Sequence, residues 1–151
     1  DLEQGFLNLG ALDYSVNAVE LTNKLLIDSK ASPLAFVGDI MNPAASIPEC
    51  EHRKYDLVVD KGTFDAMSLN PDIFGFKTNT LADAVKSCLA FVFRPDSAFK
   101  RFVITSCNWT SDELKTIFAP ELQPVAEVAH ASFVFGNRVG HDVSTVIFEW
   151  Q

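Results

Sequence analysis

The sequence has few cysteines and no arrangement of them that would hold a metal. Its three cysteines, Cys50, Cys88 and Cys107, are odd in number and widely spaced, which indicates free thiols in a reducing compartment. There is no Cys-x-x-Cys pair, and the three histidines are not at ligand spacing from the cysteines. The sequence therefore predicts no metal site.

Long apolar runs and clusters of basic residues are also missing. The longest apolar runs, of about five residues, are far shorter than the roughly twenty that span a bilayer. Residues 1–20 lack the basic and apolar pattern of a signal peptide. The net charge is −8, and phosphate binding needs concentrated positive charge, which disfavours nucleic acid as the main partner. With 151 residues and 48% hydrophobic content, the chain is expected to be one cytoplasmic domain over 1–151.

Strand and helix patterns alternate along most of the chain. Strands are predicted over 9–13, 33–39, 55–60 and 100–107, helices over 16–29 and 81–93, and loops over 40–54 and 66–79. Thr110 and Glu113 have the spacing of a capping box and predict another short helix. After Pro120, strand-like stretches at about 124–135 and 143–149 flank a turn-rich segment, as in a hairpin. This order predicts an α/β fold, a mostly parallel sheet with a C-terminal antiparallel hairpin.

Three of the predicted parallel strands finish on an acid: Asp13, Asp39 and Asp60. Ligands of open α/β sheets bind outside the carboxyl ends of the strands, so these acids are expected at one edge. There a carboxylate can accept hydrogen bonds from ribose hydroxyls or an amino group, or face a cation. Aspartate is equally common at strand exits because its side chain makes local turns. The residues alone leave both interpretations open.

Four segments carry a resemblance to a known family: GALDYSVNAVEL, VVDKGTFDAMSLNPD, RFVITSCNWTSDEL and SFVFGNRVGHDVSTVIFE. Together they resemble the seven-strand S-adenosylmethionine-dependent methyltransferases, which have a Rossmann-like fold. Among these, the similarity is to the lysine methyltransferases that modify translation elongation factor 1-alpha, and it extends from about Gly5 to Glu149. It implies S-adenosyl-L-methionine as cofactor, elongation factor 1-alpha as protein substrate, and no membrane or nucleic-acid partner.

The resemblance also implies a role for individual residues. Asp13, with Tyr14 beside it, would bind the cofactor ribose, and Gly38 and Asp39 would line the adenine. Asp60 and Lys61 would border the methionine part of the cofactor and the methyl-transfer centre. The lysine channel would be lined by Phe64, with Asn108 and Trp109 in the substrate-side wall. For Phe64 and Trp109, ordinary core packing is the alternative.

One element of the family pattern is not in the sequence. The acid-x-Gly-x-Gly-x-Gly turn that follows the family's first strand is absent, and residues 1–6 resemble the end of the helix after it. The domain is therefore expected to be N-terminally incomplete, lacking a strand between those at 9–13 and 55–60. Without it, two apolar strand edges would be unpaired.

Two other interpretations compete with the enzyme. The absent glycine turn favours a catalytically silent, partner-binding methyltransferase-like module, or a truncated fragment that binds no cofactor. A phospho-receiver domain would use Asp13, Asp60 and Ser106 in a similar layout, but its lysine at the end of the last strand has no counterpart here.

Overall fold

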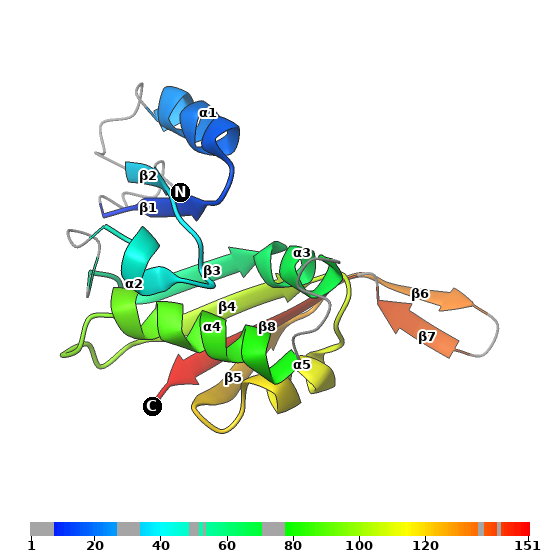
Figure 1. Ribbon diagram of the computed structural model, residues 1–151. Helices are drawn as coiled ribbons and strands as arrows, with labels where there is room; N and C mark the ends of the chain where they lie inside the picture. Colours follow the sequence, from blue (N-terminus) through cyan, green and yellow to red (C-terminus); the bar gives the residue numbers. More distant parts are fainter. Residues whose placement is uncertain are drawn as a thin grey trace.

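A computed structural model describes residues 8–26, 34–48, 52, 54–70, 78–135, 138–141 and 143–151 (Figure 1). Its strands are β1 (Gly10–Asp13), β2 (Leu34–Val37), β3 (Leu57–Lys61), β4 (Arg101–Ser106), β5 (Leu122–Val128), β6 (Ser132–Phe135), β7 (Arg138–His141) and β8 (Ser144–Trp150). Its helices are α1 (Val16–Leu26), α2 (Pro43–Ser46), α3 (Thr63–Leu69), α4 (Thr78–Val92) and α5 (Ser111–Phe118).

The strands form three sheets, and the predicted α/β class is confirmed. A four-stranded sheet has the order β3-β4-β8-β5, in which β3 and β4 are parallel and β8 runs antiparallel to β4 and β5. A two-stranded parallel sheet of β1 and β2 lies with α1 beside the β3 edge of the larger sheet (Figure 1). The β6–β7 hairpin extends away from the rest of the structure.

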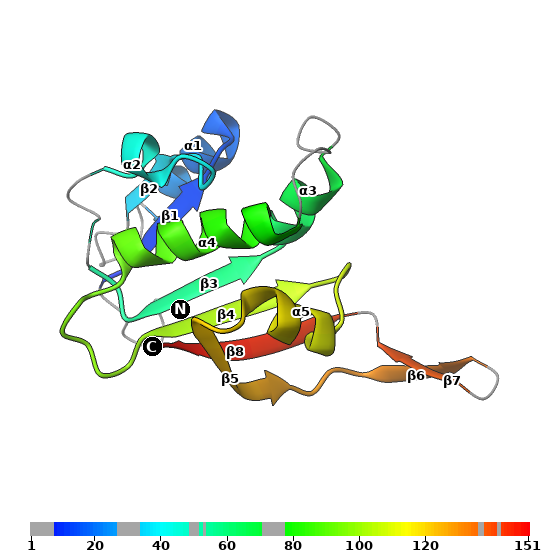
Figure 2. The same ribbon diagram turned by 60° about the horizontal axis from the view of Figure 1, so that its bottom comes forward.

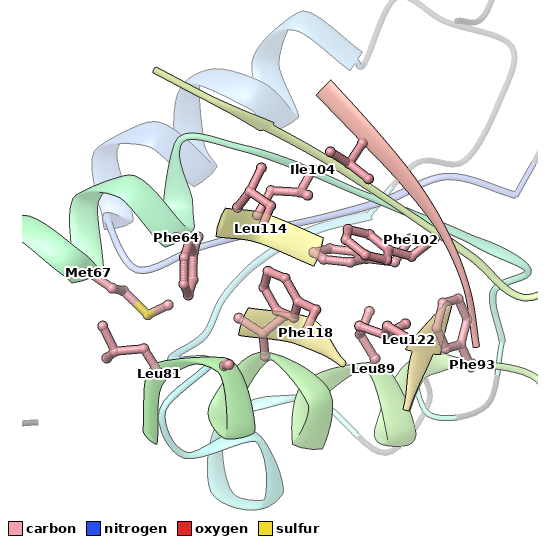
Figure 3. Packing of buried hydrophobic residues seen from close by; sticks show 14 residues of the cluster. Phe64, Met67, Leu81, Leu89, Phe93, Phe102, Ile104, Leu114, Phe118 and Leu122 are labelled. Atoms are coloured by element: carbon pink, nitrogen blue, oxygen red, sulfur yellow. The ribbon is translucent and has the colours of Figure 1, made fainter. Parts of the chain in front are cut away.

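The hydrophobic core lies on one face of the four-stranded sheet, under α4 and α5 (Figure 2). Along β4 every second residue is buried, so one row of side chains points into this core. Figure 3 shows these side chains packing against residues of α3, α4 and α5. The buried cluster consists of Phe64, Met67, Leu81, Ala82, Val85, Leu89, Phe93, Phe102, Ile104, Leu114, Phe118, Leu122, Val146 and Phe148.

Two of the predicted helix starts are confirmed by their caps. The Ser15 hydroxyl accepts a hydrogen bond from the backbone N–H of Ala18 at 3.4 Å, at the start of α1. Thr110 and Glu113 form the reciprocal capping box at the start of α5. The predicted extension of the first helix to residue 29 lies outside the described residues.

Two short helices overlap the segments 40–54 and 66–79 that the sequence predicted as loops, and at those helical residues the predictions were wrong. Residues 49–51, 53 and 71–77 of these segments lie outside the described residues. In the segment 40–54, Pro43 begins α2 at the first helical position, where proline needs no N–H partner. α3 follows β3 after a single residue, Gly62, whose φ of 88° is accessible to glycine and strained for other residues. This left-handed residue leads from the strand directly into α3, which occupies all of 63–69.

The C-terminal region differs from the single predicted hairpin. The stretch predicted as one strand over about 124–135 is divided into β5 and β6, and the turn-rich segment contains β7. β5 pairs with β8 along the sheet edge, with an irregularity between Pro124 and Ala126. A proline and a bulge are common at edge strands, because they disfavour pairing with a further strand.

In the described ranges, none of the helices is long and apolar enough to cross a membrane.

Candidate functional site

The three strand-end aspartates all make local turns. Each uses a carboxylate oxygen to accept a hydrogen bond from a backbone N–H two or three residues further on. These bonds join Ser15 N to Asp13 Oδ1 (2.8 Å), Met41 N to Asp39 Oδ1 (2.8 Å) and Thr63 N to Asp60 Oδ1 (2.9 Å). All three aspartates therefore form the local turns that the sequence allowed for. A carboxylate can accept several hydrogen bonds, so each can still accept one from a ligand.

Asp60 differs from the other two acids by its burial. Its side chain is 8% exposed, and its second oxygen accepts a hydrogen bond from the backbone N–H of Phe64 at 3.1 Å. Burial raises the pKa of the Asp60 carboxyl above its ordinary value, although the N–H groups of Thr63 and Phe64 act in the opposite direction. An acid whose pKa is shifted by burial next to a cavity is a candidate for a functional site.

Asp13 and Asp39 remain more accessible. Among the described residues, neither has a hydrogen-bond partner for its Oδ2 atom, so each keeps an oxygen that can accept from a hydroxyl or amino group. Tyr14, next to Asp13, is 80% exposed.

Gly38 brings the ends of β1 and β2 close together. Its N–H donates to the carbonyl of Asp13 at 3.0 Å. A Cβ atom at this position would lie 2.6 Å from Cδ1 of Leu12, a distance that would force the leucine to move. Glycine therefore fits here without displacing the Leu12 side chain, which a larger residue would have to push aside.

A cavity of about 880 Å³ separates β1 from β3. Gly10 and Leu12 line it from β1, Asp60 and Thr63 from the other side, and Cys88 from α4. Of the residues predicted from sequence, only Asp60 is among those lining this cavity. The others lie at the ends of β1, β2 and β3, on α3, or in the loop after β4: Asp13, Tyr14, Gly38, Asp39, Lys61, Phe64, Asn108 and Trp109. In the described part of the chain, β1 and β3 are not hydrogen-bonded neighbours.

The predicted substrate-side residues meet where α3 contacts the end of β4. The rings of Phe64 and Trp109 have centroids 6.0 Å apart. Phe64 is 1% exposed and belongs to the core, whereas Trp109 is half-buried and Asn108 exposed. Phe64 therefore packs beneath the surface that the other two residues form, and its place in a substrate channel stays a prediction.

One residue of this region received no role from the sequence. Asp65 accepts hydrogen bonds from the Ser106 hydroxyl and the Cys107 N–H at the end of β4. The sequence signal that could have identified Asp65 is its place in the distinctive segment DKGTFDA. Its hydrogen-bond partners could not be predicted from it, because they are about forty residues away in sequence. Among the described residues, no group of three His, Cys, Asp or Glu side chains could hold a metal ion.

The chain has homologues among curated proteins, although no protein-family model matches it. It is 36% identical over 146 residues to EEF1A lysine methyltransferase 2 of Danio rerio, covering 96% of this chain and 58% of that protein. The identity to the Homo sapiens protein of that name is 31% over 149 residues, 96% of this chain and 57% of that protein. Protein-lysine N-methyltransferase EFM4 of Saccharomyces cerevisiae is 40% identical over 99 residues, 65% of this chain and 42% of that protein. The chain thus spans less than three-fifths of the length of the relatives it matches.

Solved structures show the fold at much lower sequence identity. N-methyltransferase NodS from Bradyrhizobium japonicum superposes with a TM-score of 0.61 at 13% identity, over 95% of this chain and 73% of that one. The PH0226 protein from Pyrococcus horikoshii gives a TM-score of 0.62 at 11% identity, over 99% of this chain and 74% of that one. The predicted Rossmann-like methyltransferase fold is confirmed.

Proposed function

We propose that this homologue of the EEF1A lysine methyltransferase 2 proteins acts as a protein-lysine N-methyltransferase. It would transfer a methyl group from S-adenosyl-L-methionine to a lysine of translation elongation factor 1-alpha, in the cytoplasm. The observation that carries the proposal is sequence similarity over 96–98% of the chain to proteins of that name.

The chemistry of the strand ends fits the proposed cofactor. Asp13, with Tyr14 exposed beside it, offers a carboxylate oxygen to the ribose hydroxyls, and Asp39 next to Gly38 offers one to the adenine amino group. Asp60 and Lys61 would face the methionine part. Such acceptors at successive carboxyl ends of parallel strands follow the general rule for ligand sites in open α/β sheets.

The bound cofactor would supply an electrophilic methyl group, and the chain's own residues would position the lysine amine in line with it. The Asp60 carboxylate is fixed by Thr63 and Phe64 and retains acceptor capacity for a lysine N–H. A carboxylate next to an ammonium raises the pKa of the amine, so Asp60 would orient the lysine rather than act as a strong base. The proton would leave to water.

Two alternatives compete with this proposal: a catalytically silent module that binds a partner protein, and a fragment without cofactor binding. Each predicts that S-adenosyl-L-methionine does not bind, whereas the enzyme must bind it.

The decisive experiment combines binding and turnover in the full-length protein. Calorimetric titration with S-adenosyl-L-methionine should show binding, and transfer of labelled methyl to purified elongation factor 1-alpha should map to lysine by mass spectrometry. An absence of binding up to low-millimolar cofactor would overturn the enzyme proposal. Binding with methylation of another protein class would overturn the proposed substrate.

A further inference from the structure

A chain of hydrogen bonds connects the first turn of α3 to the loop that follows β4. The Asp65 carboxylate accepts a hydrogen bond from the Ser106 hydroxyl at 2.5 Å through Oδ1, and one from the Cys107 N–H at 2.9 Å through Oδ2. Both carboxylate oxygens are thus bonded to the end of β4. The first bond is a charge-assisted bond at the short end of the range for O–H donors.

Ser106 also holds the backbone of the residues that follow it. Its oxygen accepts hydrogen bonds from the backbone N–H groups of Asn108 and Trp109, each at 3.0 Å. A serine hydroxyl has one donor and two acceptor positions, and here all three are used. Because Ser106 is only 1% exposed, water has little access to replace a lost partner.

The same helix also holds the side chain of Trp109. Its Nε1 donates to the Ser68 hydroxyl at 3.4 Å, and Ser68 in turn donates to the carbonyl of Asp65 at 2.8 Å. The ring packs on Phe64, the residue before Asp65. Backbone and side chain of Trp109 are therefore both fixed relative to α3.

We infer that Asp65 is a positioning residue for the substrate-side wall formed by Asn108 and Trp109. The inference rests on the proposed function, since it names the residue that sets the shape of the proposed lysine-binding surface. Asp65 acts through Ser106, and through the Cys107 N–H, on residues that would contact the protein substrate. An acid in the first turn of α3 also interacts favourably with the helix dipole, and that role alone would affect stability without affecting substrate recognition.

Two variants interrupt the bond chain at different links. Asp65→Asn keeps the shape but leaves one oxygen to accept, so either Ser106 or Cys107 loses its partner. Ser106→Ala removes the atom that holds Asn108 and Trp109. In the full-length protein, both should raise the KM for the protein substrate, with kcat/KM lower by about tenfold, a typical effect of losing a bond to a charged group. The KM for S-adenosyl-L-methionine should stay unchanged.

Matched controls lie on α4. Asp83 is 71% exposed with a 3.7 Å contact to Lys86, and Ser87 is exposed, so Asp83→Asn and Ser87→Ala should leave both KM values unchanged. The double variant of Asp65 and Ser106 should be little worse than the more impaired single variant, because both changes break one connected unit.

A readout without turnover separates this inference from the proposed function. The backbone amide NMR signals of Asn108 and Trp109 should shift in both variants and in neither control, whether or not the protein methylates a lysine. Unmoved amide signals in folded Ser106→Ala protein would refute the connection itself. The Asp65→Asn variant could also show shifted signals and lower thermal stability while its KM for the protein substrate stays at the wild-type value. That result would show that Asp65 contributes to stability alone. Failure of the wild-type protein to methylate any protein would refute the proposed function instead.

Discussion

The ring of Phe64 lies 6.0 Å from the ring of Trp109, centroid to centroid, with an angle of 47° between their planes. Phe64 also packs on Phe118 of α5 at 5.3 Å (Figure 3). One buried ring therefore contacts both the core and, through Trp109, the predicted substrate surface. The stability of the domain and the shape of that surface therefore share a residue.

Replacing Phe64 by alanine should destabilise the fold by about 3–5 kcal/mol, the usual effect of deleting a buried aromatic ring. Phe99→Ala is the matched control, because the Phe99 side chain is 68% exposed and its loss should change stability by less than about 0.5 kcal/mol. Urea unfolding followed by circular dichroism measures both. Equal midpoints for the two variants would contradict the packing described for Phe64.

Asp60→Asn should abolish methyl transfer while the protein stays folded. The amide removes the buried charge, a gain in stability, but accepts from only one of the two N–H groups of Thr63 and Phe64, a loss. These effects oppose each other, so the unfolding free energy at pH 7 should change by only about 1 kcal/mol. Near-normal turnover by this variant would refute the positioning role of Asp60.

The stability of the Asp60 variant should also depend differently on pH. Because burial raises the pKa of Asp60 in the folded state, its stabilising contribution is present below the unfolded pKa and decreases as the pH rises through the folded pKa. Relative to the Asp60→Asn variant, the wild type should therefore be more stable near pH 3.5 than near pH 7. Urea titrations of both proteins at the two pH values test the sign, and the opposite trend would show that the backbone donors dominate.

The capping box of α5 gives a stability prediction away from the site. Thr110→Ala removes the hydroxyl that accepts from the Glu113 N–H and should cost about 0.5–2 kcal/mol. Thr116→Ala in the same helix is the control. Thr116 is exposed and bonds back to the Asp112 carbonyl, so alanine there should be neutral or stabilising. A smaller effect at Thr110 than at Thr116 in thermal melts would contradict the cap.

The two described cysteines should differ in reactivity. Burial raises the pKa of the Cys88 thiol to about 11, so at pH 8 it is almost entirely protonated, whereas Cys107 is exposed. Iodoacetamide followed by peptide mass spectrometry should label Cys107 first, and Cys88 only when urea unfolds the protein. Equal labelling of both thiols in the folded state would show that the cavity beside Cys88 is open to reagent.

Elements with a strong periodic pattern could be predicted from the sequence, and those determined by single residues could not. The α/β class was predicted from the order of strand and helix patterns along the chain, to which the strand at β4 and the apolar stripe of α4 contribute. α3 was missed because its start depends on Gly62 and on the Asp60 side chain, with no stripe long enough to indicate a helix. The division of 124–135 into two strands was missed because six of the seven residues of β5 are exposed, which leaves no alternation.

The candidate site was predictable to the same limited extent. The acids at the ends of β1 and β3 follow directly from the strand pattern, and their local hydrogen bonds are those that aspartate commonly makes in turns. The bond between Asp65 and Ser106 joins residues 41 positions apart, so it depends on the parallel pairing of β3 with β4 and on the helix that follows Gly62. Local patterns carry no information about such a contact.

The turns made by Asp13, Asp39 and Asp60 have a consequence for the thermodynamics of ligand binding. Each side chain is already held in one rotamer by a backbone N–H. Immobilising a side chain on binding usually costs about 0.5–1.5 kcal/mol of conformational entropy. Here the side chains already lose most of that entropy when the chain folds. A molecule that binds at these strand ends therefore meets acceptors whose directions are set in advance, and more of its interaction energy appears as affinity.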